Sequence, residues 1–287
     1  MAEIREFYMR AFLYELEAAI NRKDLFKHVR FQLDEANTDK ETKKAVKDFI
    51  NNEINTIRTV QKVIIDGKSY DLKKDSFKVL KVIEPEEYTE KDKELVKTLK
   101  KGIYVNPDLT LTCLIEGKQY IEYLELKSTK TDKIPGSSVQ QIVPDEWVLF
   151  IKHTDKSINT ISGQYKYSIS GTMQFPDRSP RPQVSYNELL NWIEDYRVFQ
   201  SKTLEFKKDE SASEKEELIN DWQGVLSHRW MKVIQSKRKE NGEPWFNNNL
   251  RKFVFQLLNY YDTLDKEKKE ELKNSIERNI EDWWTTI

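Results

Sequence analysis

Apolar residues near the N-terminus recur at intervals of four, the spacing of one face of an α-helix. The repeat consists of Ile4, Tyr8, Phe12, Leu16 and Ile20. It predicts an amphipathic helix over residues 3–21 whose charged face lies in solvent. A second helix is predicted to run to about Ile57, because Thr38-Asp39-Lys40-Glu41 resembles a capping box at its start.

Short apolar or alternating runs, bounded by turn residues, predict the strands of a sheet. These runs span residues 60–72 with a turn at Asp66-Gly67, then 77–83, 109–115, 120–126, 146–152 and 163–174. A charged helix is expected from Thr89 to Lys101, where Gly102 ends it. Strands and helices therefore alternate along the first two thirds of the chain.

Helical patterns dominate the C-terminal third. They cover residues 186–196, 250–261 and 264–284, separated by a charged connector at 207–217 and a loop at 242–249. The last helix is expected either to cap the core or to pair with a second subunit. We predict one α/β domain, a central mixed β-sheet flanked by helices, with an N-terminal region 1–94, a core 95–200 and a helical C-terminal region 201–287.

The composition limits the kinds of partner that the chain is expected to bind. The 287 residues include 48 Lys and Arg against 49 Asp and Glu, so the formal net charge is −1. Any nucleic acid would need a segregated basic surface, and the best candidate is residues 222–239, with five Lys or Arg and no acidic residue. The single cysteine, Cys113, is predicted to be a core residue. With no signal peptide and no apolar run of about 20 residues, the chain is expected to be cytoplasmic without a membrane partner.

The two runs around Glu116-Gly117 form the most informative pattern. A short turn with glycine between alternating apolar residues predicts a β-hairpin in which paired residue numbers sum to 233. Asp108 then faces Glu125, with Cβ atoms about 5 Å apart, and Lys127 stands roughly 7 Å further along the same face. Like charges in this position need a compensating cation. Carboxylate oxygens without thiolate or imidazole ligands favour Mg²⁺.

These residues resemble the PD-(D/E)xK nucleases, whose motif here is Pro107-Asp108 followed by Glu125-Leu126-Lys127. Residues 136–142 and 146–152 look like the helix and the strand that follow the hairpin in that fold. Size and arrangement are most similar to Type II restriction endonucleases. The resemblance covers about residues 95–155 and implies a restriction-endonuclease-like core with extra helices at both ends.

The letters of the motif are not specific in so charged a chain. An acidic residue, any residue and then Lys occurs eight times, and Pro-Asp occurs three times. The sequence context favours one of these tripeptides as the motif. Glu125-Leu126-Lys127 lies in an apolar strand, whereas Glu116-Gly117-Lys118 lies at the hairpin tip. The alternative interpretation is an ordinary hairpin with a surface ion pair.

The resemblance implies a Mg²⁺-dependent double-stranded DNA endonuclease that hydrolyses phosphodiesters. Asp108 and Glu125 would hold the metal, with the Leu126 carbonyl as a further ligand, and Lys127 would orient or activate the attacking water. A second metal would need a third carboxylate, for which Glu53 and Glu94 are candidates. A homodimer acting at palindromic sites and a cognate DNA methyltransferase in the same system, without direct contact, are also expected.

Contacts to DNA are expected close to the catalytic strand. The candidates are Lys130, Ser138, Gln140, Gln141, Arg178 and Arg181. Amide side chains can read adenine edges and arginines can bind guanine or phosphate, although a serine helix cap and solvated arginines explain the same letters. Scattered histidines and the lack of a phosphate-binding loop argue against a zinc site or an ATP-driven enzyme. Two rivals remain: a repair or recombination nuclease of the same fold, and a non-catalytic DNA-binding module.

Overall fold

The computed structural model describes residues 3–29, 31, 35–90, 93–94, 107–134, 143–154, 157–171, 183–238 and 243–280, with the backbone alone at 35–39 and 133. The chain divides into two compact units. The first contains residues 1–173 and 182–219, and the second contains 174–181 and 220–287. We expected one domain with a C-terminal region from residue 201, whereas the first unit extends to Ile219.

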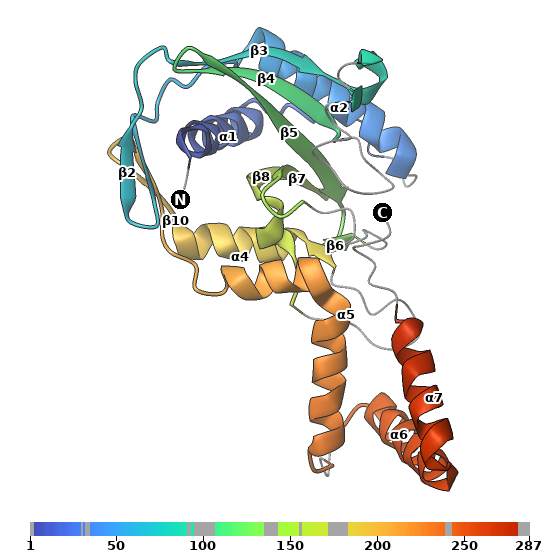
Figure 1. Cartoon of the computed structure of the whole chain (residues 1–287). Helices are drawn as coiled ribbons and strands as arrows, with labels where there is room; N and C mark the ends of the chain where they lie inside the picture. Colours follow the sequence, from blue (N-terminus) through green and yellow to red (C-terminus); the bar gives the residue numbers. More distant parts are fainter. Residues whose placement is uncertain are drawn as a thin grey trace. The chain divides into compact units, whose positions relative to one another are not determined.

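The centre of the first unit is a five-stranded mixed sheet in the order β3-β4-β5-β7-β8 (Figure 1). Its strands are β3 (Phe77–Ile83), β4 (Leu109–Ile115), β5 (Lys118–Thr129), β7 (Trp147–His153) and β8 (Ile158–Gln164). The first three form an antiparallel meander, β7 lies parallel to β5, and β8 is antiparallel to β7. The predicted α/β class with a mixed sheet is confirmed. The 163–174 prediction was partly wrong, because β8 begins earlier and gives way to the 3₁₀ helix η3 (Tyr165–Ser168).

Helix α1 (Ile4–Lys23) lies across the sheet, and its predicted apolar repeat belongs to the core except for Ile4, which is exposed. Tyr8, Phe12, Leu16 and Ile20 are almost fully buried, in one cluster with the apolar residues of β4 and β5. Burying each large apolar side chain contributes about 1.5–3 kcal/mol, so this helix is a principal source of stability for the unit. Cys113 is fully buried in the same cluster, as predicted.

The expectation that the charged face of α1 is solvated was wrong. Glu15 and Glu17 are both buried. Glu15 accepts hydrogen bonds from the backbone N–H groups of Arg58, Thr59 and Val60, while Glu17 forms a two-pronged ion pair with Arg197 at 2.9 and 2.6 Å. Buried carboxylates need such partners, and here they tie α1 to segments far away in the sequence.

The first unit also contains a four-stranded sheet in the order β10-β11-β1-β2. The hairpin β1 (Lys62–Ile65) and β2 (Lys68–Asp71) turns at Asp66-Gly67, as predicted, with positive φ at both residues. The second hairpin, β10 (Arg197–Gln200) and β11 (Thr203–Phe206), was not predicted. Its β11 pairs in parallel with β1 and thereby joins the two hairpins in one sheet.

Further elements flank the sheets. They are α2 (Glu35–Asn52), the 3₁₀ helix η1 (Pro85–Glu87), α4 (Tyr186–Tyr196) and the small pair β6 (Lys133–Ile134) with β9 (Val184–Ser185). Helix α2 begins before the predicted capping box, and α4 has the predicted bounds. The expected helix at 136–142 lies outside the described residues, as does most of the helix expected from Thr89.

All the elements described in the second unit are helices, and the first of them begins in the first unit. Helix α5 (Ala212–Gln235) is interrupted at Asp221, whose carboxylate accepts a hydrogen bond from Gly224 N–H and caps the second half. Helices α6 (Trp245–Thr263) and α7 (Lys266–Arg278) follow, so the loop expected at 242–249 is largely helical and the connector expected at 207–217 contains the start of α5. Among the described residues, no helix has the length and apolar character required to cross a membrane.

Candidate active site

The β4–β5 hairpin has the predicted register. Pairs run from Leu109 with Leu124 to Ile115 with Lys118, so the paired numbers sum to 233. Glu116 and Gly117 both have positive φ, 48° and 80°, as a two-residue hairpin turn requires. Asp108 lies one residue before β4, and the register brings it beside Glu125 at the end of the paired segment.

Asp108 is held by two contacts. Its Oδ2 accepts a hydrogen bond from Leu126 N–H at 2.7 Å, and its Oδ1 lies 2.8 Å from Nζ of Lys43. Lys43 comes from α2, and both side chains are largely buried. The carboxylate is therefore fixed at the edge of β5 and carries a cation from a distant helix.

Glu125 and Lys127 share one face of β5, two residues apart. Lys127 Nζ donates to Glu125 Oε1 at 2.7 Å, and both side chains are about one fifth exposed. In the parallel ladder with β7 they lie opposite Val148 and Phe150. The three predicted residues thus converge, each within reach of solvent but shielded from it on most sides.

Tyr165 borders the site from η3. Lys127 Nζ lies 5.9 Å from the centre of its ring, and the ring is buried. Burial by itself would lower the pKa of Lys127, but Tyr165, Glu125 and Asp108 outweigh it and hold that pKa above its ordinary value. The lysine is a cation in this geometry, suited to orienting water or balancing negative charge.

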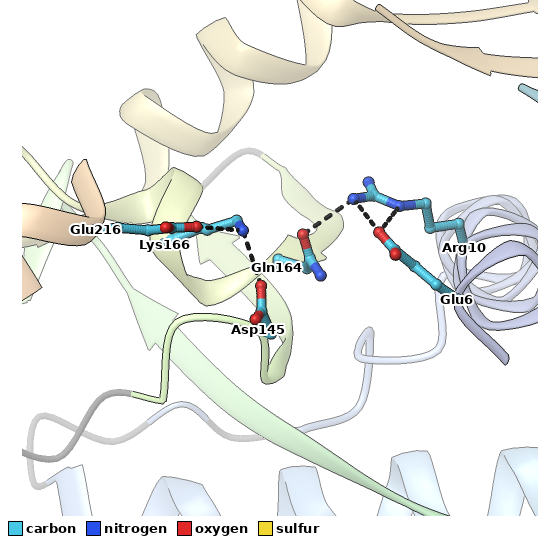
Figure 2. A network of polar contacts seen from close by, with 6 residues as sticks. All are labelled: Glu6, Arg10, Asp145, Gln164, Lys166 and Glu216. Carbon is cyan, nitrogen blue, oxygen red and sulfur yellow. Dashed lines mark hydrogen bonds and ion pairs between the residues drawn. The ribbon is translucent and has the colours of Figure 1, made fainter. Parts of the chain in front are cut away.

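The residues on either side of Tyr165 are anchored by a polar network (Figure 2). Gln164 accepts a hydrogen bond from Arg10 of α1 at 2.9 Å, and Arg10 also binds Glu6. Lys166 binds Asp145 and Glu216, both at 2.8 Å. These contacts fix the short helix that carries Tyr165, and through it the wall behind Lys127.

The two carboxylates that could bind a metal ion are each paired with a lysine, Asp108 with Lys43 and Glu125 with Lys127. Within the described residues no group of three or more His, Cys, Asp and Glu side chains is placed to hold a metal ion. Asp108 and Glu125 still fit the one or two carboxylates that Mg²⁺ takes in proteins, with water and substrate oxygens completing its shell. The ammonium of Lys43 on Asp108 marks that carboxylate as a cation-binding group.

The other predicted residues are distributed as follows. Leu126 is buried on the opposite face, and its N–H rather than its carbonyl contacts Asp108. Lys130 is exposed just after β5. Ser138, Gln140, Gln141, Arg178 and Arg181 lie outside the described residues.

The structure does not bring the two candidates for a third carboxylate to the motif. Glu53 is ion-paired with Lys23, and it follows Lys43 by ten residues, roughly 15 Å along the helix direction. Glu94 is exposed. Glu146, just before β7, is buried on the face that carries Glu125, and its field raises the pKa of Tyr165 after the larger effect of burial.

Lys43, Tyr165 and Glu146 were not identified from the sequence. The capping box at Thr38 predicted the helix α2 but not which of its residues contacts the hairpin. Tyr165 falls in a run that we interpreted as a strand. Of the three, only Glu146 could have been found from the sequence, because it lies at the start of a predicted strand. Placing it near the site would also have required knowing that this strand pairs with β5.

Comparisons with protein-family models, with curated proteins and with solved structures found no match to this chain.

Proposed function

We propose that the protein is a Mg²⁺-dependent endonuclease of the PD-(D/E)xK type that cleaves double-stranded DNA, as Type II restriction enzymes do. The observation that carries the proposal is the convergence of Asp108, Glu125 and Lys127 at one end of the β4–β5 hairpin. Two carboxylates and a lysine, all partly buried, are the groups that a metal-assisted phosphodiester hydrolysis needs.

The sheet supports the same proposal by analogy of fold. An antiparallel meander followed by a strand parallel to its third member places the two motif strands, β4 and β5, at the middle of the sheet. The restriction-endonuclease-like core expected from the resemblance has this arrangement. Fold analogy alone does not establish an activity, so the residues of the site carry the argument.

In the proposed mechanism the carboxylates of Asp108 and Glu125 would hold the metal ion, and the Leu126 carbonyl would be a further ligand. When bound, Mg²⁺ supplies a Lewis acid for the phosphate and lowers the pKa of a coordinated water. Lys127 orients the attacking water and balances the charge that develops on the phosphate. Lys43, whose ammonium lies 2.8 Å from Asp108 Oδ1, would compete with a metal ion for that oxygen.

One observation favours the rival, a DNA-binding module in which the hairpin is only structural. Each carboxylate already has a lysine partner, so the four charges are balanced without a metal ion. A repair or recombination nuclease of the same fold is the closer rival. As partners of the proposed enzyme we infer duplex DNA and a second copy of the chain, and for a restriction system in the cytoplasm, a cognate methyltransferase.

A cleavage assay on long DNA tests the proposal. The purified chain is incubated with Mg²⁺ or with EDTA, and wild type is compared with Lys127→Met and with Lys118→Met. Lys118 is the matched control, because it belongs to the same hairpin and also follows a glutamate by two residues, but lies at the exposed tip. We expect Mg²⁺-dependent cleavage that falls by about 100-fold or more in Lys127→Met and persists in Lys118→Met.

The products separate the alternatives. Discrete bands support a restriction enzyme, whereas a smear or structure-dependent nicking supports a repair nuclease. Binding without cleavage under any divalent ion would support the non-catalytic module and overturn the proposal.

A further inference from the structure

Helix α6 exposes large apolar side chains, most of them on one wide face. Ten of its 19 residues are apolar or aromatic, yet Leu250 alone is buried among those described. Trp245, Phe253, Phe255, Leu258 and Tyr260 are each between 55% and 65% exposed. An apolar helix face is normally packed against other elements, whereas within the described residues this face of α6 is left largely open.

Helix α7 also exposes apolar side chains. None of its residues is buried, and Leu272, Ile276 and Ile280 recur at intervals of four from α7 into the residues just beyond it. Ile276 and Ile280 are 50% and 65% exposed. Helices of this length gain most of their stability from packing an apolar face, whereas among the described residues α7 buries no side chain and α6 buries only Leu250.

The area matches what a stable dimer buries. At about 200 Å² for each large side chain, the exposed fractions of the five α6 residues, Ile276 and Ile280 amount to roughly 800 Å². That is about the area each partner contributes to a standard protein interface. Apolar patches of this size on a single chain are typical of interaction surfaces.

The charged residues of α6 and α7 favour a protein partner over DNA. The only basic residues of α6 are Arg251 and Lys252, and Arg251 is bound to Glu243, so the aromatic surface offers little to a DNA backbone. Helix α7 carries five basic and four acidic residues in alternating groups. A nearly neutral surface of mixed sign complements a second copy of itself when the two run antiparallel about a two-fold axis.

We propose that α6 and α7 form a homodimer interface, in which the two helices of one chain pack against the same two helices of a second chain as a four-helix bundle. Their apolar side chains form the bundle core, and the charged residues of α7 lie at its rim. The inference does not depend on the proposed nuclease activity.

Sedimentation velocity and light scattering of the full-length chain, over about 1–100 µM, test this dimer. Wild type is compared with Leu258→Asp and Phe255→Lys. Leu80→Asp is the matched control, because it makes the same change at a similarly exposed leucine on β3. Hydrogen exchange of α6 amides is followed over the same dilution, and circular dichroism confirms that each variant is folded.

We expect a concentration-dependent dimer whose Kd rises by about 100-fold in both α6 variants, because each change places two charges in the bundle core. Leu80→Asp should leave Kd unchanged, and α6 amides should lose protection on dilution. A chain that stays monomeric, a dimer indifferent to both α6 variants, or a monomer with protected α6 amides would each overturn the proposal. The last result would mean that α6 is covered by its own chain.

Discussion

Lys43 Nζ lies 2.8 Å from Oδ1 of Asp108, and this ion pair joins helix α2 to the start of β4. Neither side chain is more than 16% exposed, so the interaction is poorly screened. A metal ion that uses the same carboxylate oxygen must compete with this ammonium. The same carboxylate oxygen therefore stabilises the fold through Lys43 and is a proposed ligand of the metal ion.

The first prediction follows from that competition. Lys43→Gln removes the competing charge, so Mg²⁺ or Mn²⁺ should bind Asp108 more tightly, with a dissociation constant about 3- to 10-fold lower by calorimetric titration. Lys44→Gln is the control, because Lys44 is the more exposed neighbour on the same helix. An equal or weaker affinity in Lys43→Gln would show that Lys43 does not compete with the metal.

The second prediction separates the two roles of Asp108. Asp108→Asn keeps an oxygen that accepts the hydrogen bond from Leu126 N–H. Asp108→Ala removes both this acceptor and the carboxylate that pairs with the ammonium of Lys43. Urea unfolding should show Asp108→Ala destabilised by about 1–3 kcal/mol and Asp108→Asn by less. Both variants should lose DNA cleavage by about 100-fold or more, because both remove a charged metal ligand. Cleavage retained in folded Asp108→Asn would contradict the metal role.

The sequence predicted those parts of the site that depend on local pattern. Strand alternation and a glycine turn were enough to give the register that brings Asp108 beside Glu125. The positions of Lys43 and Glu17 could not be obtained in this way. Each depends on the packing of a helix against strands distant in the sequence, and helical spacing reveals a buried face only when that face is apolar. Glu15 and Glu17 of α1 are buried because the backbone before β1 and Arg197, respectively, satisfy their carboxylates.

The third prediction concerns pH. The Glu116 carboxylate at the hairpin turn accepts hydrogen bonds from Lys73, Tyr70 and Tyr8, which lower its pKa to about 2. A folded-state pKa below the ordinary value adds stability above about pH 4.5, and this stability is lost as the pH falls toward 2. In urea unfolding, wild type should be more stable than Glu116→Gln at pH 7, and the difference should shrink between pH 5 and 2. A difference that is constant over this range would mean that the charge of Glu116 does not stabilise the turn.

The Arg10 contacts provide a fourth prediction. Arg10 is buried between Glu6 and Gln164, and its guanidinium lies 4.4 Å from the centre of the Phe206 ring. Arg10→Met leaves a carboxylate and an amide without their donor, so the free energy of unfolding should fall by about 2–4 kcal/mol. Arg5→Met is the control, because Arg5 is half exposed on the same helix. A decrease below about 0.5 kcal/mol would show that the network does not hold η3 in place.

The last prediction tests whether α5 binds DNA phosphates in the proposed nuclease. The second half of α5 and the residues after it carry Arg229, Lys232, Lys237 and Arg238, all exposed, with no acidic residue between them. Reversing two of these charges, in Arg229→Glu with Lys232→Glu, should weaken duplex binding and reduce the slope of log K against log salt by about one unit for each phosphate that is no longer bound. Lys268→Glu with Lys269→Glu is the matched control, since it makes the same change on α7, where lysines alternate with glutamates and phosphate contacts are not expected. Binding assays at several salt concentrations give both quantities for each pair. If affinity and slope fell equally in the two double variants, the effect would reflect the overall charge of the chain, and α5 would not be the DNA-binding surface.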